Sequence, residues 1–364
     1  MAESTSALYE KLQSQKPQVN LARPTVGRMW LVSLCAFLAV IQSSLTDNFF
    51  SLLIALAAVI AAVLTEFIIL YQSGRVLQLK IGSAVASALI LTLLLPNRIS
   101  PLYAICGAVF AIAVVKHSFG GLGSNWLNPA AGGWLFIRIA WPGAFNKALE
   151  GSPLSLLAES LARGFANSQG SPLGILKIDS EGVFTQVTNL DTVIRSFFND
   201  TIFSITGAEL PGGYMDLFVV RAPGIIADRG SLALLIGTII ITATQVNRAW
   251  IPAVWLGVFA FLVRLAGAFS FGGTWWGGDV LFALFTGAVL PAAFILAADP
   301  ATGAKSNWGI LGATIAGAFL AFFFRFYGGE AYGTIFAILT VNGLLPMVRA
   351  FEARHFYDKR SIHE

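Results

Sequence analysis

Long apolar runs separated by short polar segments make up most of the chain. A helix that crosses the hydrocarbon core of a bilayer needs about 20 mostly apolar residues. The third and fifth runs look short, so the predicted number of such helices is ten to within one or two. The ten runs are residues 29–46, 49–71, 82–96, 101–117, 127–142, 231–246, 250–269, 279–298, 308–326 and 331–348.

The long segment between the fifth and sixth runs, residues 143–230, is predicted to lie on the outer face of the membrane. Apolar residues recur at helical spacing over 152–165, and 189–198 begins with an asparagine of the kind that caps helices. We expect a short helix at each place. A connection of this length is uncommon unless it carries a function.

The ten runs divide into two sets of five, residues 29–142 and 231–348. Because five is odd, the second set is predicted to be inverted relative to the first, as in many carriers. The predicted domains are these two membrane repeats, the outer segment between them, an N-terminal tail of residues 1–28 and a C-terminal tail of residues 349–364.

Short motifs support the division into repeats. Lys116 precedes Phe119-Gly120-Gly121, and Arg325 precedes Tyr327-Gly328-Gly329; a predicted helix follows each glycine pair. A chance match of such short motifs is the alternative interpretation. A second pair, not at equivalent places, is Asn128-Pro129-Ala130 and Asp299-Pro300-Ala301.

Composition identifies the class of protein. Of the 364 residues, 56% are hydrophobic and 12% are charged, about half the charged fraction of a typical soluble protein. The mean hydropathy is +0.74. The chain is therefore predicted to be an all-α polytopic membrane protein embedded in a lipid bilayer.

Basic residues indicate the orientation. The two predicted tails and the loops on their side of the membrane carry most of the lysines and arginines, among them Lys116, which we assign with His117 to a loop. By the positive-inside rule, both termini are cytoplasmic. This bias also explains the net charge of +4, so no nucleic-acid partner is predicted.

Several signals are missing from the sequence. The first 28 residues lack the pattern of a signal peptide. Cys35 and Cys106 both fall within predicted helices, where small packing residues are the simplest interpretation. The three histidines are not spaced as metal ligands, so no metal site is predicted.

A glycine-rich stretch, FGGLGSNWLNPAAGG at residues 119–133, interrupts the apolar pattern. Backbone outside a helix survives at membrane depth only where protein buries it or where it lines a polar cavity. The stretch is therefore either a turn between the fourth and fifth helices or a break that lines a ligand or ion site. Asn125 and Asn128 could bind freed backbone groups or a ligand, and Asn128-Pro129 has the form of a helix start.

Charged side chains inside the predicted spans are costly and often functional. Glu66 lies deep in the second span, where we expect it to be buried and to face the bundle and not lipid. It is the candidate for an ion-coupling or proton-coupling carboxylate. Arg264 and Arg325 lie near helix ends, where long side chains can reach the membrane surface. Asp299 ends the eighth span in a position to face a cavity.

Five segments resemble one family of membrane flavoproteins, whose members include the D subunit of the Rnf electron-transport complex and the B subunit of the sodium-pumping NADH:quinone reductase. Together, in order, they cover most of residues 75–350, and the short N-terminal tail is more similar to the Rnf member. The segments are 82–96, 116–130, 230–237 with 248–252, 284–303 and 333–346.

The resemblance implies a ten-helix inverted-repeat fold similar to that of urea channels, in the cytoplasmic (inner) membrane of a bacterium. It implies partnership with the other subunits of an Rnf-type complex, and a flavin, FMN or another, as cofactor. The cofactor-binding residues that we assign are Thr206, Gly207, Ala208, Gly120, Gly121, Asn125, Asn128 and Asp299.

The outer segment departs from the family's pattern. The resemblance implies that FMN is attached through a phosphoester to a threonine in a Ser/Thr-Gly-Ala-Thr motif. Here Thr206, Gly207 and Ala208 are followed by Glu209, which has no hydroxyl and whose charge would repel a phosphate. Phe203 also stands where an aspartate is expected. We therefore expect any flavin to be bound non-covalently.

Three functions remain open at this point. The first is an electron-transfer subunit that couples flavin chemistry to ion movement. The second is a solute carrier or channel on the same scaffold. The third is a structural subunit of the complex without redox chemistry. A fold alone does not choose between them.

Overall fold

The computed structural model describes most of the chain outside its termini and the outer segment. Its elements are helices joined by turns, and the described part contains an isolated backbone bridge between Pro96 and Ile225. The all-helical class expected from the sequence is confirmed. The described residues are 25–45, 47–118, 120–121, 123–149, 189–201, 224–244, 246, 248–269, 275–278, 280–328 and 332–361.

In the first half, one apolar helix corresponds to each predicted run. The short third and fifth runs give short helices, as expected. A 3-10 turn, η1 (Val76–Ile81), precedes the third helix, and a short helix, α7 (Pro142–Leu149), follows the fifth. The main helices are α2 (Thr25–Ser44), α3 (Phe50–Gln72), α4 (Ser83–Leu94), α5 (Pro101–Phe110), which continues as the π-helical turn η2 (Ala111–His117), and α6 (Pro129–Ala140).

The second half follows the predicted runs with one exception, at the eighth. It is preceded by α10 (Asn189–Thr201), which confirms a helix where the sequence predicts one, and by α12 (Ile226–Arg229). Its main helices are α13 (Ser231–Ala243), α14 (Trp250–Ala266), the pieces α15 (Val280–Phe285), α16 (Val289–Pro291) and η5 (Ala292–Leu296), then α17 (Asn307–Phe326) and α18 (Gly333–Ser361).

The distribution of side chains on α3 is that of a membrane helix. Its buried face is rich in small residues such as Ala55, Ala58 and Ala62, whereas large apolar residues such as Ile60 and Leu64 are exposed. A soluble helix would bury the large residues, but in lipid small residues allow helices to approach closely. Among the described residues, α2, α3, α17 and residues Gly333–Ala353 of α18 are long and apolar enough to cross a membrane.

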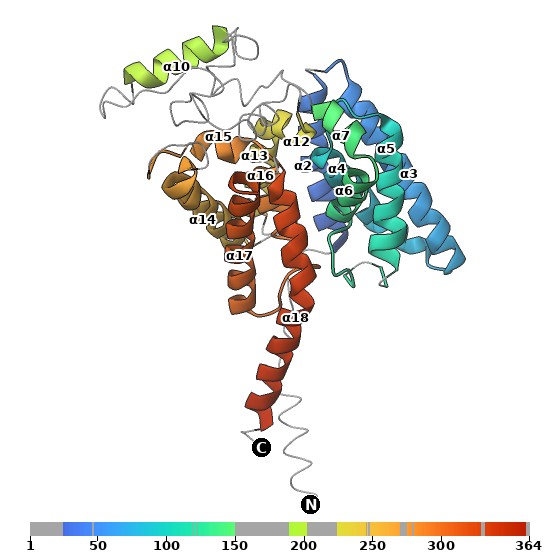
Figure 1. Ribbon diagram of the computed structural model, residues 1–364. Coiled ribbons are helices and arrows are strands. Elements are labelled where there is room, and N and C mark those ends of the chain that lie inside the picture. The colour runs from blue at the N-terminus through green and yellow to red at the C-terminus, as the bar shows by residue number, and fades with distance from the viewer. Residues whose placement is uncertain are drawn as a thin grey trace, which may run out of the picture.

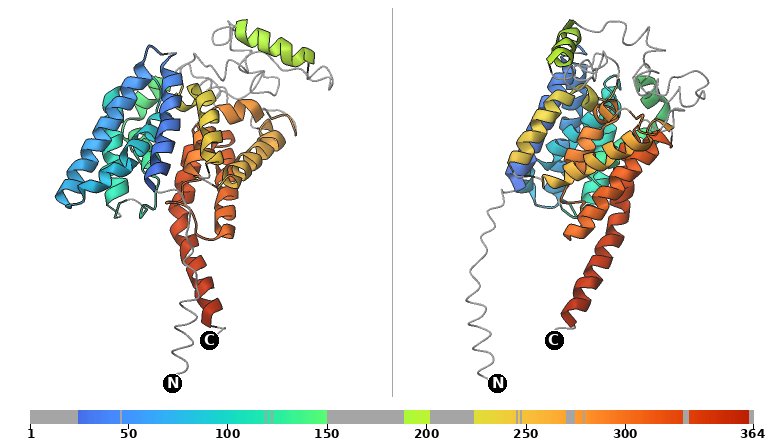
Figure 2. Two further views of the ribbon diagram at one scale, coloured as in Figure 1. Left: turned by 180° about the vertical axis from the view of Figure 1, so that it is seen from behind. Right: turned by 90° about the vertical axis from the view of Figure 1, so that its left-hand side faces the viewer.

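Similar helix pairs recur in the two halves. In the first, α3 packs against α5 and α5 against α6; in the second, α14 packs against α17 and α17 against α18. The halves meet where α2 packs against α13 and where α6 contacts α18. Figure 1 shows the two halves side by side, with α18 extending beyond the bundle on the side away from α10. The start of α2 and the end of α18 lie on that same side (Figure 2).

The eighth predicted run is not one helix. Gly287 and Ala288 have positive φ angles of 72° and 61°, which interrupt the helix between α15 and α16. Positive φ is easy for glycine but strained for alanine. The prediction of one continuous span at 279–298 is therefore wrong, because an apolar composition does not reveal a local reversal of φ.

Two charged side chains satisfy the backbone exposed by this break. The carboxylate of Asp228 accepts hydrogen bonds from the amides of Gly287 (2.8 Å) and Ala288 (3.1 Å), at the start of α16. The guanidinium of Arg325 donates to the carbonyls of Ala283 (2.7 Å) and Thr286 (2.9 Å), at the end of α15, and also to the Thr286 hydroxyl. Arg325 is only 3% exposed, so it does not reach the membrane surface as its position near a helix end suggested.

A second irregular crossing lies where α4 ends. The Ile226 amide donates to the Leu95 carbonyl (3.0 Å), and the Asn97 amide donates to the Gly224 carbonyl (2.9 Å). The Asn97 side chain accepts a further bond from the Gly224 amide (3.2 Å). Ile225 and Ile226 are fully buried here, so the end of the predicted outer segment packs into the bundle.

We expect the helix break to depend on the Asp228 carboxylate. Asp228→Ala removes the acceptor of two amides, and each buried amide left unpaired costs about 1–3 kcal/mol. The variant should unfold at a clearly lower temperature than the natural protein in detergent, followed by the fluorescence of its nine tryptophans. Asp200→Ala, which alters an exposed aspartate on α10, is the matched control; equal melting temperatures for the two variants would contradict this account.

Candidate functional site

The glycine-rich stretch forms an irregular loop between η2 and α6. Gly120 and Gly121 adopt φ angles of 106° and 91°, a region that other residues rarely enter. The Gly121 amide donates to the Lys116 carbonyl (3.1 Å). The Asn125 side chain lies beneath this turn, and with its amide nitrogen facing inward it donates to the carbonyls of Lys116 (3.2 Å) and Gly121 (2.7 Å).

Asn128 joins the two halves of the chain. Its side-chain oxygen caps α6 by accepting from the amides of Ala130 (3.0 Å) and Ala131 (3.4 Å). Its side-chain nitrogen donates to the carboxylate of Asp299 (3.0 Å), 171 residues away. The Asn-Pro-Ala and Asp-Pro-Ala motifs noted in the sequence are therefore in direct contact.

The loop after η5 is held by Asp299 and by α18. Asp299 also accepts from the Ala301 amide (3.0 Å) and, more weakly, from the Thr302 hydroxyl (3.4 Å). Arg349 of α18 donates to the carbonyls of Ala301 (3.0 Å) and Gly303 (2.7 Å). All hydrogen bonds named for Asn128 and Asp299 are made within the protein, so these two side chains fix the shape of the site.

One turn further along α18, Glu352 holds the end of the same loop. Its carboxylate accepts from the amides of Lys305 (3.1 Å) and Ser306 (3.1 Å) and from the Ser306 hydroxyl. Ser306 in turn caps α17 by accepting from the Gly309 amide (2.9 Å). The last helix thus determines where α17 begins.

Glu66 lies in a buried cluster beside the glycine-rich loop. It is 4% exposed and is ion-paired with Lys116, which is 2% exposed. The Lys116 ammonium also donates to the Ser83 hydroxyl (2.6 Å). The ring of His117 faces the same carboxylate, with its Nε2 3.6 Å from Glu66 Oε1.

Burial of Glu66 is what the sequence led us to expect, whereas burial of Lys116 is not. The sequence places Lys116 in a cytoplasmic loop because it ends an apolar run. In the structure it lies on the π-helical turn and faces Glu66 across the bundle. A basic residue at a helix end carries no signal for a partner 50 residues earlier in the chain.

The glycine-rich loop offers an accessible surface to a ligand. Nothing lies within 4 Å of the place where a side chain at Gly123 would begin, and Ser124 beside it is exposed. The Trp126 ring is 38% exposed. An exposed aromatic ring beside open backbone is a surface on which a planar ring system can stack. Thr206, Gly207, Ala208 and Glu209 lie outside the described residues.

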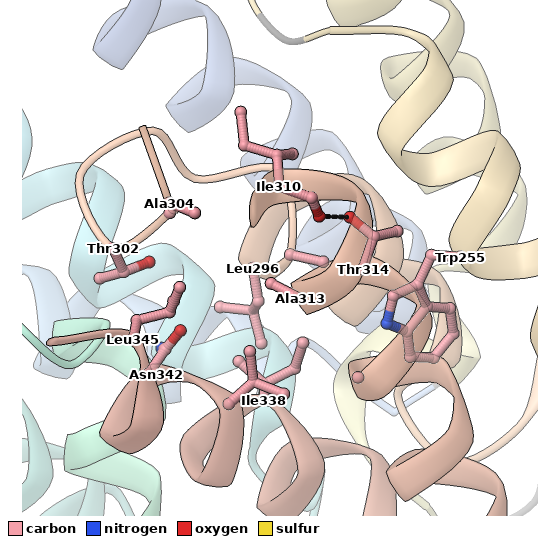
Figure 3. Close-up of a pocket in the computed structure, with 14 residues that line it drawn as sticks. Trp255, Leu296, Thr302, Ala304, Ile310, Ala313, Thr314, Ile338, Asn342 and Leu345 are labelled. Carbon is pink, nitrogen blue, oxygen red and sulfur yellow. Dashed lines mark hydrogen bonds between the residues drawn. The ribbon is translucent and has the colours of Figure 1, made fainter. Parts of the chain in front are cut away.

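A small pocket lies between α14, α17, α18 and the loop after η5 (Figure 3). Thr302 and Asn342 lie at one end and Trp255 at the other. Within the described part of the chain, the Asn342 Nδ2 and the Trp255 Nε1 have no hydrogen-bond partner. Because Thr302 also contacts Asp299, the pocket adjoins the site formed by the two loops.

Comparison with known proteins decides the family. The sequence model described as the NQR2, RnfD, RnfE family matches residues 12–358. The chain belongs to this family. The resemblance inferred from five separate segments is thereby confirmed over nearly the whole length.

Individual relatives of this family member are distant but extend over nearly the whole chain. It is 28% identical to the D subunit of the proton-translocating ferredoxin:NAD(+) oxidoreductase complex of Clostridium ljungdahlii, over 93% of each chain. It is 28% identical to the D subunit of the ion-translocating oxidoreductase complex of Vibrio cholerae, over 92% of this chain and 95% of the relative. The D subunit of the Na(+)-translocating ferredoxin:NAD(+) oxidoreductase complex of Acetobacterium woodii is 24% identical over 96% of each chain.

We expect the contact between Asn128 and Asp299 to survive an exchange of the two residues. Asn128→Asp keeps the cap on α6 but places two carboxylates together, and Asp299→Asn removes the charge that Asn128 faces. Each single variant should lower the melting temperature. The double variant restores a donor and an acceptor and should recover most of the loss, with a coupling energy of roughly 0.5–3 kcal/mol. Additive losses in the double variant would show that the contact contributes nothing.

Proposed function

We propose that this protein is the membrane subunit of an ion-translocating, Rnf-type electron-transport complex. In this proposal it contributes a non-covalently bound flavin and part of the ion path. The family match and the names of the relatives support the complex, and the other subunits of that complex are its partners. A flavin supplies the transfer of one or two electrons when it is bound.

One observation supports coupling between electron transfer through the flavin and ion movement. Lys116 uses its side chain to hold Glu66 and its backbone carbonyl to accept from Gly121 and Asn125 of the glycine-rich loop. The candidate ion site and the candidate cofactor loop therefore share a residue. Through Asn128 and Asp299 the same loop contacts the second half of the chain.

The roles of individual residues follow from these contacts. Gly120 and Gly121 form the turn, Asn125 fixes that turn, and Asn128 with Asp299 sets the position of the loop relative to the second half. Glu66 is the ion-coupling carboxylate. In the same proposal, ten helices form two inverted repeats in a bacterial inner membrane, with both termini in the cytoplasm; the recurring helix pairs and the shared side of α2 and α18 support it.

Overall similarity is compatible with either a proton or a sodium ion as the translocated ion. One relative is named for proton translocation and another for sodium translocation, at 28% and 24% identity. The alternative of a carrier or channel without redox chemistry would use the pocket beside Asp299 instead. A structural subunit without cofactor would use neither site.

We expect the purified chain to show the visible absorbance of a flavin, and acid precipitation to release that flavin into the supernatant. On a denaturing gel, no fluorescent band should remain with the chain, because Glu209 has no hydroxyl for attachment. A fluorescent peptide containing residues 201–209 would show that another hydroxyl, such as that of Thr206, accepts the phosphate. Absence of any flavin would favour a carrier or a structural subunit.

We expect Glu66→Gln to abolish ion uptake driven by electron transfer in vesicles carrying the complex. The flavin content and the assembly of the complex should be preserved, because glutamine keeps an oxygen that can accept from Lys116 and the loop contacts of Asn125 and Asn128 remain. Uptake should be measured with both sodium and proton indicators. Asp200→Asn serves as the control. Normal ion uptake by Glu66→Gln would show that Glu66 only packs the bundle and does not couple ion movement.

A further inference from the structure

The ammonium of Lys116 is bound by two oxygen atoms in a buried site. Its Nζ contacts a carboxylate oxygen of Glu66 and lies 2.6 Å from the Ser83 hydroxyl oxygen. The two oxygens are themselves 3.5 Å apart. Glu66 and Ser83, on α3 and the start of α4, are both buried. Small hard cations prefer oxygen ligands, and two such oxygens converge here on one positive charge.

A free cation and the Lys116 ammonium could not share this site. In a buried environment of low dielectric, two positive charges at contact distance repel strongly. Removal of the ammonium alone would leave an unpaired buried carboxylate, which is also costly. An exchange of one cation for the other avoids both costs.

We propose that Lys116 is a tethered cation that competes with an alkali-metal ion for the oxygens of Glu66 and Ser83. The ion enters only when Lys116 leaves, and Lys116 returns when the ion is released. This inference rests on the proposed role of Glu66 and adds the class of ion and the residue that closes the site.

The backbone of Lys116 links the proposed exchange of cations to the glycine-rich loop. Lys116 lies on a π-helical turn, a conformation frequent at functional sites. Its carbonyl accepts from the Gly121 amide and the Asn125 side chain. A shift of the glycine-rich loop therefore displaces the backbone that carries the Lys116 side chain.

Arg325 is the corresponding residue of the second half, and its contacts differ from those of Lys116. Arg325 also precedes a glycine pair and also contacts a buried hydroxyl, that of Thr286. Its planar guanidinium in addition binds two backbone carbonyls that define the helix break. A lysine has a compact charge on a flexible stem, whereas an arginine held by several bonds is fixed. Exchange is thus expected at Lys116 and not at Arg325.

The binding step can be tested without electron transfer. The purified chain is unfolded by heat at about pH 8, at which an ordinary histidine is neutral, in NaCl, LiCl, KCl or choline chloride. The natural protein should melt at the same temperature in all four salts. Lys116→Gln should melt lower in choline chloride and recover in at least one alkali-metal salt, because the ion replaces the ammonium.

Two variants control this measurement. Lys80→Gln, which alters an exposed lysine of η1, should behave as the natural protein does. Glu66→Gln combined with Lys116→Met removes both charges and should respond to none of the salts. The inference is overturned if folded Lys116→Gln shows no response, if the natural protein responds equally, or if the response persists in the double variant.

A charge-preserving variant covers the case in which Lys116→Gln does not fold. Lys116→Arg keeps the ion pair and adds donors that hold it closed. In vesicles with the intact complex, sodium uptake driven by electron transfer should fall to background, with the flavin content unchanged and Lys80→Arg normal. Normal sodium uptake by Lys116→Arg would overturn the exchange. Absence of flavin from the natural complex would instead contradict the proposed function, whatever the melting temperatures in the four salts are.

Discussion

Every backbone group that leaves a helix within a membrane needs a partner inside the protein, and this requirement shapes the whole bundle. Three of the buried places where the described chain leaves its helices are the break between α15 and α16, the crossing of residues 95–97 with 224–226, and the loop before α6. At the break the partners are charged side chains, at the crossing they are backbone and Asn97, and at the loop they are asparagines. Most of these contacts join segments that are far apart in the sequence.

Each half of the chain has one buried basic residue shortly before a glycine pair, and the two differ in what they hold. Arg325 binds carbonyls, so its role is to maintain a backbone shape. Lys116 binds a carboxylate and a hydroxyl, so its partners are groups that could equally bind an ion. A single scaffold thus contains a fixed cation in one half and an exchangeable one in the other.

The sequence predicted the helices well because apolar runs of the right length have few other structures available in lipid. It also identified the family, the burial of Glu66 and the capping role of Asn128. It did not predict the break at Gly287, since only local φ angles distinguish it from a continuous helix. Nor did it predict the pairing of Lys116 with Glu66 or of Asn128 with Asp299, because these contacts depend on how the helices pack together. The flavin assignment stays a prediction for Gly120, Gly121, Asn125, Asn128 and Asp299, and equally for Thr206, Gly207 and Ala208 outside the described residues.

The contacts of α18 have a consequence for how the protein is made. Arg349 and Glu352 hold the loop that begins at Asp299 and ends at the cap of α17. Both residues belong to α18, which is synthesised after this loop because chains are made from the N-terminus. During membrane insertion, the loop after Asp299 therefore gains Arg349 and Glu352 as partners only once α18 has been made. The order of synthesis therefore places completion of the site after the synthesis of α18, and a nascent chain that ends before Arg349 lacks the partners that hold this loop.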